Sequence, residues 1–328
     1  MVSWVIHSQV SGLGHRVSGS GVQVQVRLLG SSFPNRQPLT AITSRIFPCP
    51  LALSCPSPYP YPYPKLSTMR SLIALLLASV VALAAEPNRA LVFSKTAGFR
   101  HKDSIPLGNE VLAKQFKAAG LEADITEDAA VFTTENLAKY RAIAFMSTTG
   151  DIMGDVVAKD ATKEAKDAAA KAALPRRAAF QAWLENGGAF VGVHAASDAG
   201  AAEKYWPWFA NMIGGLFSGH PAQQVAILRP LVKDHPANKH LGAEWKRKDE
   251  WYSFRNLAAD NLVLLEIDEK SYTPQKGKEM GDHHPMTWCK DVGKGRMFYT
   301  ALGHTKESFS EPDFLQHLNG GLLWTLRK

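Results

Sequence analysis

The feature that most constrains the fold is an alternation of short apolar runs with segments of helical periodicity. The runs have the length of strands and are bounded by polar loops; they occupy residues 90–94, 140–147 and 189–193, and residues 121–126 alternate apolar and polar side chains as a strand does. Between them, Ile105–Phe116 and Arg177–Glu185 repeat apolar residues at helical spacing. Strands that alternate with helices in this way predict an α/β fold, with a parallel sheet covered by helices on both faces.

The second half of the sequence follows a looser pattern. Residues 223–228 and 262–267 are strand-like. Met286–Lys290 and Arg296–Ala301 flank a glycine-containing turn, which predicts a C-terminal β-hairpin. Asp313–Leu326 repeats apolar residues at helical spacing and is predicted to be the last helix.

Residues 155–174 are rich in Ala, Lys and Asp and contain few large apolar side chains. This composition predicts an exposed helical insertion, which Pro175 is expected to end. Because the insertion follows the third strand, it could cover a cleft at that edge of the sheet.

The first 84 residues differ in character from the rest. Residues 1–68 are rich in Pro, Gly and Ser, and we expect them to be a disordered extension. Residues 69–84 combine Met69-Arg70, the apolar run Leu72–Leu83 and an A-x-A site, as a signal peptide does. We therefore expect translation to start at Met69, the mature domain to be residues 86–328, and the protein to be periplasmic or secreted. The alternative is that the apolar run is a buried helix or an anchor.

The net charge of +7 belongs to this N-terminal region. Six of the 37 Lys and Arg residues lie in residues 1–84, but none of the 30 Asp and Glu residues do, which leaves +1 for residues 85–328. Such a balance gives no reason to expect a nucleic-acid partner. Cys289 is the only cysteine after residue 84, so the domain can form no internal disulfide and has no cysteine pair for zinc.

Polar side chains follow four of the predicted strands directly, and three of these loops contain a histidine. The residues, in chain order, are His101, Thr149, His194, Asp198, His304 and Glu307. Ligands of parallel sheets bind beyond the carboxyl ends of the strands. We therefore expect His101, His194 and His304 to gather around one cleft, although any one of them could be a structural histidine.

Imidazole suits such a site because it exchanges protons near neutral pH and binds metals in its neutral form. His194 has small neighbours, Gly192 and Ala195, as a tight strand-to-helix turn requires. The G-x-S-x-G, phosphate-loop and H-E-x-x-H patterns are missing from residues 85–328. Cys289 falls inside a predicted strand, which favours a packing role.

A second group of residues suggests sugar binding, in which aromatic rings stack on sugar faces and carboxylates accept hydroxyl hydrogen bonds. The acidic residue Glu250 precedes Trp251 and Tyr252, and His284 could reach the same cleft. The segment that contains Trp206 and Trp208 follows Asp198 and could form a wall of this cleft. The alternative is that these aromatic residues form an ordinary core.

Several strings together resemble the ThuA-like, trehalose-utilisation family over about residues 90–326. They are Lys95–Ser104, Gly192–Asp198, Trp206–Trp208, Asp249–Phe254, His284–Trp288 and Gly295–Phe309. The resemblance implies a flavodoxin-like sheet of the class I glutamine amidotransferase-like superfamily. It also implies a role in the metabolism of trehalose, related disaccharides and their 3-keto derivatives.

The wider superfamily carries a cysteine on the turn where this sequence has His194, and a later His–Glu pair that His304 and Glu307 resemble at different spacing. Without a thiolate there, glutamine amidotransfer is excluded. We expect a hydrolase or lyase on glycosides or keto-glycosides, with His194 and His304 as general base and acid. Glu307 would orient His304, and His101 would polarise a substrate oxygen.

Three further possibilities follow from the same residues. A divalent metal held by His101, His194 and His304 could stabilise negative charge on the substrate. The chain could be a non-catalytic carbohydrate-binding protein that uses its aromatic residues. It could also be an accessory subunit of a sugar oxidoreductase, or an oligomer. In each case the ligand is a small sugar, and the domain has no stable membrane span after signal cleavage.

Overall fold

The computed structural model describes residues 87–158 and 160–328. The proposed extension and signal peptide, residues 1–68 and 69–84, lie outside the described residues. Among the described residues, no helix combines the length and hydropathy needed to cross a bilayer.

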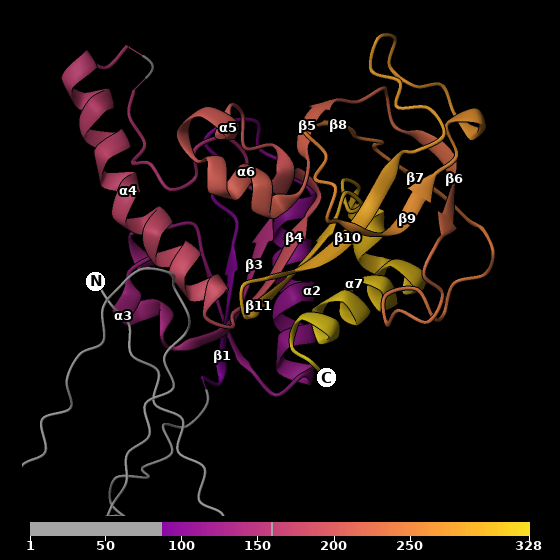
Figure 1. Cartoon of the computed structure of the whole chain (residues 1–328), viewed down its shortest axis with the longest axis horizontal. Helices are drawn as coiled ribbons and strands as arrows, with labels where there is room; N and C mark the ends of the chain where they lie inside the picture. Colours follow the sequence, from indigo (N-terminus) through magenta and orange to yellow (C-terminus); the bar gives the residue numbers. More distant parts are fainter. Residues whose placement is uncertain (1–86, 159) are drawn as a thin grey trace, which may run out of the picture. The chain divides into compact units, whose positions relative to one another are not determined.

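A nine-stranded mixed sheet forms the centre of the fold, in the order β2-β1-β3-β4-β11-β10-β9-β6-β7 (Figure 1). The first five strands in this order run parallel: β2 (Glu122–Thr126), β1 (Arg89–Phe93), β3 (Tyr140–Met146), β4 (Ala189–Val193) and β11 (Gly295–Thr300). The others pair antiparallel: β10 (Pro285–Val292), β9 (Leu262–Ile267), β6 (Gln224–Pro230) and β7 (Trp245–Asp249). The predicted α/β class and the hairpin of β10 and β11 are confirmed.

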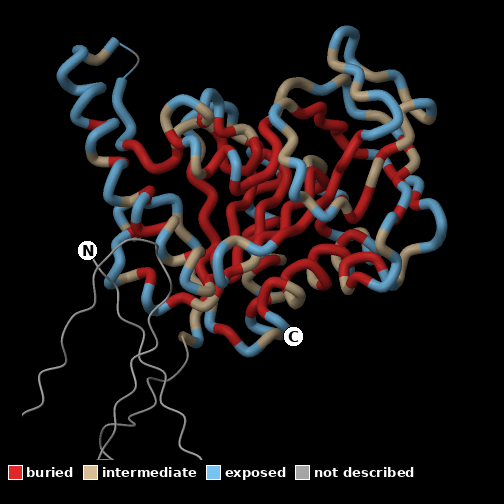
Figure 2. The backbone as a smooth tube through the Cα atoms, viewed as in Figure 1, coloured by how far each residue is buried: buried red, intermediate tan, exposed pale blue. Residues whose placement is uncertain are grey.

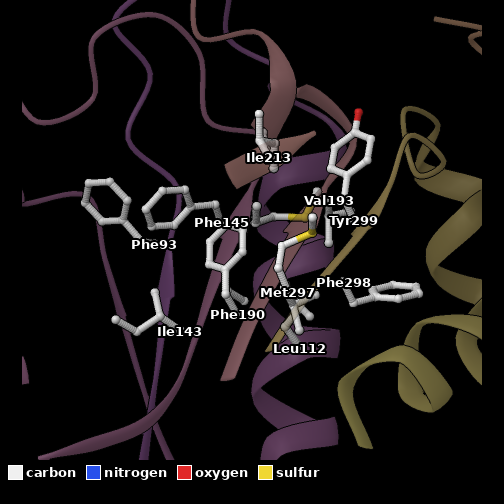
Figure 3. Packing of buried hydrophobic residues seen from close by; sticks show 14 of the residues in the cluster. Phe93, Leu112, Ile143, Phe145, Phe190, Val193, Ile213, Met297, Phe298 and Tyr299 are labelled. Atoms are coloured by element: carbon white, nitrogen blue, oxygen red, sulfur yellow. The ribbon is translucent and has the colours of Figure 1, made fainter. Parts of the chain in front are cut away.

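Helices cover both faces of the sheet. On one face α4 (Lys163–Glu185) and α6 (Pro207–Ile213) pack Phe180 and Phe209 against Phe145 of β3. On the other, α7 (Pro312–Thr325) packs against Phe298 of β11 and lies beside α2 (Ser104–Ala118) (Figure 3). Figure 2 shows that the central strands are buried along their length. These two apolar layers fix the strand ends that carry the loops.

The shorter elements lie between these parts or at the edges of the sheet. β5 (Leu216–Gly219) and β8 (Ser253–Arg255) pair with each other as a separate two-stranded sheet. The remaining short helices are α3 (Thr134–Leu137), α5 (Ala202–Tyr205), η1 (Ala129–Val131), η2 (His194–Ser197), η3 (Glu269–Ser271) and η4 (Lys306–Ser310).

The insertion differs from expectation in two ways. Pro175 does not end the helix but lies inside α4, which runs on to Glu185. Pro175 is exposed, so the carbonyl group that loses its intrahelical partner can bond to water instead. The N-terminal half of α4 projects from the body of the domain and does not line the cavity described below (Figure 1).

Two buried histidines away from the strand ends make the fold sensitive to acid. Burial lowers the pKa of His235 to about 4 and that of His317 to about 3. In the unfolded chain both protonate near pH 6.5, so folding is opposed as the pH falls below that value. We expect the free energy of unfolding to be lower at pH 5 than at pH 7 by about 2 kcal/mol for each histidine.

Urea unfolding at both pH values measures this dependence. His317→Asn keeps a donor for the carbonyl oxygen of Ala237, which lies 2.9 Å from Nδ1, but removes the titrating ring. The variant should therefore lose about 2 kcal/mol of the difference between pH 7 and pH 5. An unchanged difference would contradict the prediction.

Candidate functional site

His194 lies on the sharp turn that follows β4. Its φ of 51° is in the left-handed region, which is strained for a residue other than glycine. A Cβ at Gly192 would come within 3.1 Å of Tyr299, so the approach to the turn is tightly packed. Nδ1 of His194 lies 2.8 Å from the carbonyl oxygen of Ala301 and must donate to it. The lone pair of the neutral ring is therefore on Nε2.

Side chains from three other loops converge on this Nε2 atom. Nε2 of His101, after β1, is 3.3 Å away, and Nδ1 of His304, after β11, is 3.1 Å away. Glu250, after β7, places Oε2 3.0 Å from Nδ1 of His304 and 3.6 Å from Nε2 of His194. The four ligand atoms all lie within 4.8 Å of one another. The structure thus brings the three predicted histidines together and adds a carboxylate.

Tyr252 covers the cluster from one side. Its hydroxyl lies 3.0 Å from Nε2 of His194, and the two rings are 4.4 Å apart between centroids. A cavity of about 250 Å³ adjoins the cluster, lined by Phe99, His101, Asp198, Phe217, His220, Glu250, Tyr252 and His304. His194 is fully buried and does not line this cavity. A molecule in the cavity would therefore meet His101, Glu250 and His304 before His194.

A buried carboxylate holds two members of the cluster in place. Asp249, the last residue of β7, accepts hydrogen bonds from the backbone N–H groups of Gly303 at 2.9 Å and His304 at 3.1 Å. It also accepts one from the N–H of Glu250 at 2.9 Å. Arg247, equally buried, lies 3.2 Å from the same carboxylate and balances its charge. Asp249 thereby fixes the end of β7 relative to the loop after β11.

Burial and neighbouring charges shift the pKa values in the cluster. Burial, together with His194 and His304, lowers the pKa of His101 to about 3, so this ring is neutral near pH 7. Burial also opposes the charged forms of Glu250 and His304. Hydrogen bonds and attraction from His194 and His304 outweigh burial at Glu250 and lower its pKa. The hydrogen bond and attraction from Glu250 outweigh burial at His304 and raise its pKa. The site therefore keeps an anionic carboxylate beside imidazole nitrogens.

Two residues predicted to bind substrate lie behind the cavity wall. The hydroxyl of Thr149 donates to the carbonyl oxygen of Phe99 at 2.8 Å. His284 is fully buried, with Nε2 2.7 Å from the carbonyl oxygen of Tyr252 and Nδ1 2.9 Å from Glu269. Neither lines the cavity; they hold the backbone of two residues that do.

The expected wall of tryptophans is not part of the site. Trp206 stacks on Phe209 with centroids 4.6 Å apart, inside the core. The indole N–H of Trp208 donates to Glu185 at 2.7 Å. Neither residue lines the cavity, because α6 turns them toward α4. Trp251 is likewise fully buried.

The carboxylate that contacts His304 is Glu250 and not Glu307. Thr305 caps η4, which places Glu307 on an exposed surface of that short helix. Among the described residues, the Glu307 side chain has no hydrogen bond or ion pair. Glu250 was predicted as a sugar-binding residue and does line the cavity. Its contact with His304 could not be predicted from sequence spacing, because it reaches His304 from β7 at the far edge of the sheet.

Three residues of the cavity wall, Phe99, Phe217 and His220, were not predicted from the sequence. His220 follows β5, and its Nδ1 lies 3.1 Å from Oε1 of Glu250. Phe217, within β5, lies 4.3 Å from Tyr252 between ring centroids. A polar residue after a strand was the signal for the other histidines. It was not recognised here because the four residues of β5 are too few to show a strand pattern.

A flavodoxin-like sheet that carries an imidazole at the turn after β4 defines a class I glutamine amidotransferase-like fold without the nucleophilic cysteine. Residues 89–325 match the ThuA family, described as trehalose utilisation, so the chain belongs to that family. Family membership associates the chain with sugar metabolism. No curated protein matches the chain.

Solved structures agree with this assignment. A ThuA-like protein from Bacteroides uniformis is 25% identical, with a TM-score of 0.57 over 75% of this chain and 94% of that one. A ThuA-like protein from Parabacteroides merdae is 19% identical, with a TM-score of 0.52 over 73% and 90% of the two chains. The second likeness concerns the fold alone.

Proposed function

We propose that this chain is an enzyme of sugar metabolism, a hydrolase or lyase that acts on a disaccharide or a 3-keto-glycoside. The observation that carries the proposal is the convergence of His101, His194, His304 and Glu250 beside a cavity. Clusters of perturbed titratable groups in a cavity are typical of active sites. Family membership supplies the association with sugars.

A divalent cation fits this donor set. Ligand atoms about 2.0–2.1 Å from a tetrahedral zinc ion are about 3.3 Å from one another. Four of the six distances between these ligand atoms measure 3.0–3.6 Å, and all six are within 4.8 Å. Nε2 of the neutral His194 ring has a single lone pair, which cannot accept three hydrogen bonds at once. Three polar atoms nevertheless lie close to it: two imidazole nitrogens and the Tyr252 hydroxyl.

We propose that these four residues hold a divalent cation, which would supply Lewis-acid stabilisation of an enediolate. Asp198 lines the cavity, and burial raises its pKa, as suits a general base. With a 3-keto-glycoside, Asp198 would take the proton from the carbon next to the carbonyl. The bond to the departing sugar oxygen would then break, and Asp198 would return the proton to that oxygen.

A second arrangement uses the imidazoles without a cation. His304, whose pKa is raised by Glu250 against the effect of burial, would be the acid, and His194 the base. The full burial of His194 counts against this arrangement, because its Nε2 would have to reach the substrate past Tyr252. Metal content distinguishes the two.

The test combines metal analysis with turnover. Protein purified without chelator is measured for bound divalent metal and assayed on trehalose, 3-keto-trehalose and related glycosides. We expect about one metal ion per chain, and turnover that chelation abolishes and the metal restores. Turnover by metal-free protein would favour the imidazole arrangement. No turnover of any glycoside by metal-replete protein would contradict the enzymatic proposal.

The non-catalytic alternative depended on exposed aromatic residues. Of the four aromatic residues predicted for it, Trp206, Trp208 and Trp251 pack elsewhere and Tyr252 alone lines the cavity. For localisation we propose export, with residues 69–84 as the signal peptide. N-terminal sequencing of the exported protein should begin near residue 85; a first residue well before Met69 would contradict this.

A further inference from the structure

A second, larger cavity adjoins the one beside the cluster. It has a volume of about 470 Å³, compared with about 250 Å³ for the first. Both cavities are lined by Phe99, His101 and His304. We call the larger one the outer pocket and the smaller one the inner cavity. His101 and His304 of the cluster therefore lie at the boundary between the outer pocket and the inner cavity.

The inner cavity is too small to hold an extended ligand by itself. Its volume is below the roughly 300–1,000 Å³ of pockets that enclose drug-sized molecules. Tyr252 and Glu250, which form part of its wall, are both buried. A ligand that reaches the cluster from this side therefore has space for one small ring.

The outer pocket is polar but carries no dominant charge. Lys102 and Lys306 are matched there by Asp103 and Glu307. Its remaining cation, Arg100, is held by Glu127 in a bidentate pair at 2.7 and 3.0 Å. A balanced set of donors and acceptors suits a neutral, hydroxyl-rich ligand better than a phosphate.

Phe99 stands on the boundary and is 68% exposed, although it is a large apolar residue. Its backbone is fixed, because its carbonyl oxygen accepts the hydroxyl of Thr149. Its ring lies edge-on to His101, with centroids 4.9 Å apart. A held, exposed ring of this kind is a surface on which the apolar face of a sugar can stack.

We propose that the outer pocket is a second sugar subsite, which binds the departing unit of a two-ring glycoside while the ring that reacts occupies the inner cavity. Phe99 is the stacking residue of this subsite, and Gln223 is a polar contact on its wall. The inference rests on the proposed function and adds the place where the second ring of the substrate binds and the residues that would bind it.

The test compares a methyl 3-keto-glucoside, which has one ring, with 3-keto-trehalose, which has two. The quantity measured is the KM for the two-ring substrate divided by the KM for the one-ring substrate. Phe99→Ala should raise this ratio about 3- to 10-fold, and Gln223→Ala about 3-fold, with little change in kcat. Phe99→Tyr keeps an aromatic ring at this position and should leave the ratio close to that of the wild type. Leu174→Ala, which removes an exposed apolar side chain of α4, is the control and should leave the ratio unchanged.

The possible failures are distinguishable. If the wild type turns over both substrates but the Phe99 and Gln223 variants change both KM values in the same proportion, the subsite inference is overturned and the proposed function stands. If the wild type turns over neither, the proposed function fails, and calorimetric Kd values for the same pair of ligands test the subsite directly. Absence of binding by the two-ring ligand would then overturn the inference too.

Discussion

Replacing His194 with asparagine is expected to abolish binding of the proposed divalent cation and to lower kcat/KM by about 10³-fold. Asparagine tolerates the left-handed backbone at this position better than most residues. Its amide can also donate to the carbonyl oxygen of Ala301, as Nδ1 of His194 does at 2.8 Å. The substitution therefore removes Nε2, around which the other ligand atoms gather, and keeps the contact that holds the turn.

Metal analysis and steady-state kinetics on the same preparation check this result. His283→Asn is the matched control, because His283 is an exposed histidine outside the cluster. It should keep its metal and its activity. A His194→Asn protein that keeps both would show that the cluster is only structural.

Replacing Asp249 with alanine is expected to lower the free energy of unfolding by about 3–5 kcal/mol. Asp249 is fully buried, and its removal would leave the buried Arg247 guanidinium with only the partly exposed Glu311, 3.0 Å away, to balance its charge among the described residues. The N–H groups of Gly303 and His304 would also lose their acceptor. Because His304 would no longer be held toward Glu250, metal affinity should fall as well.

A double-mutant cycle separates the ion pair from general loss of packing. Arg247→Met combined with Asp249→Ala should cost less than the sum of the single changes, because each single change leaves one charge of the buried pair without the other and the double change removes both. Urea unfolding gives the free energies, and metal titration of the folded variants gives the affinities. Strictly additive costs would contradict the role assigned to the pair.

The parallel half of the fold could be predicted because its pattern is local. The runs that became β1, β3 and β4 are apolar along most of their length, as strands buried on both faces are. The antiparallel half could not be assembled, since the pairing of β9 with β6 joins residues far apart and depends on no local signal. The prediction that Pro175 ends the helix was wrong, because an exposed proline can be accommodated in a long helix whose freed carbonyl group faces water.

The site was predictable to the extent that topology determines it. His101, His194 and His304 each follow a parallel strand, and parallel strands end at the same edge. Glu250 follows an antiparallel edge strand, so its arrival at His304 depends on strand order. Trp206 and Trp208 show the converse, because an aromatic segment near a cleft in sequence can face the core instead. Whether the rings of such a segment face the cleft or the core is decided by tertiary packing.

The four loops of the cluster are far apart along the chain, and no disulfide links them among the described residues. His101 and His194 are 93 positions apart, and His194 and His304 are 110 apart. An ion bound as proposed would act as a cross-link between them, comparable to a disulfide that closes long loops. Free metal at 100 times its Kd would add about 2.7 kcal/mol to stability. In a domain whose one described cysteine is buried and free, such a cross-link would form or dissolve with the supply of the ion, as a disulfide does with the supply of oxidant.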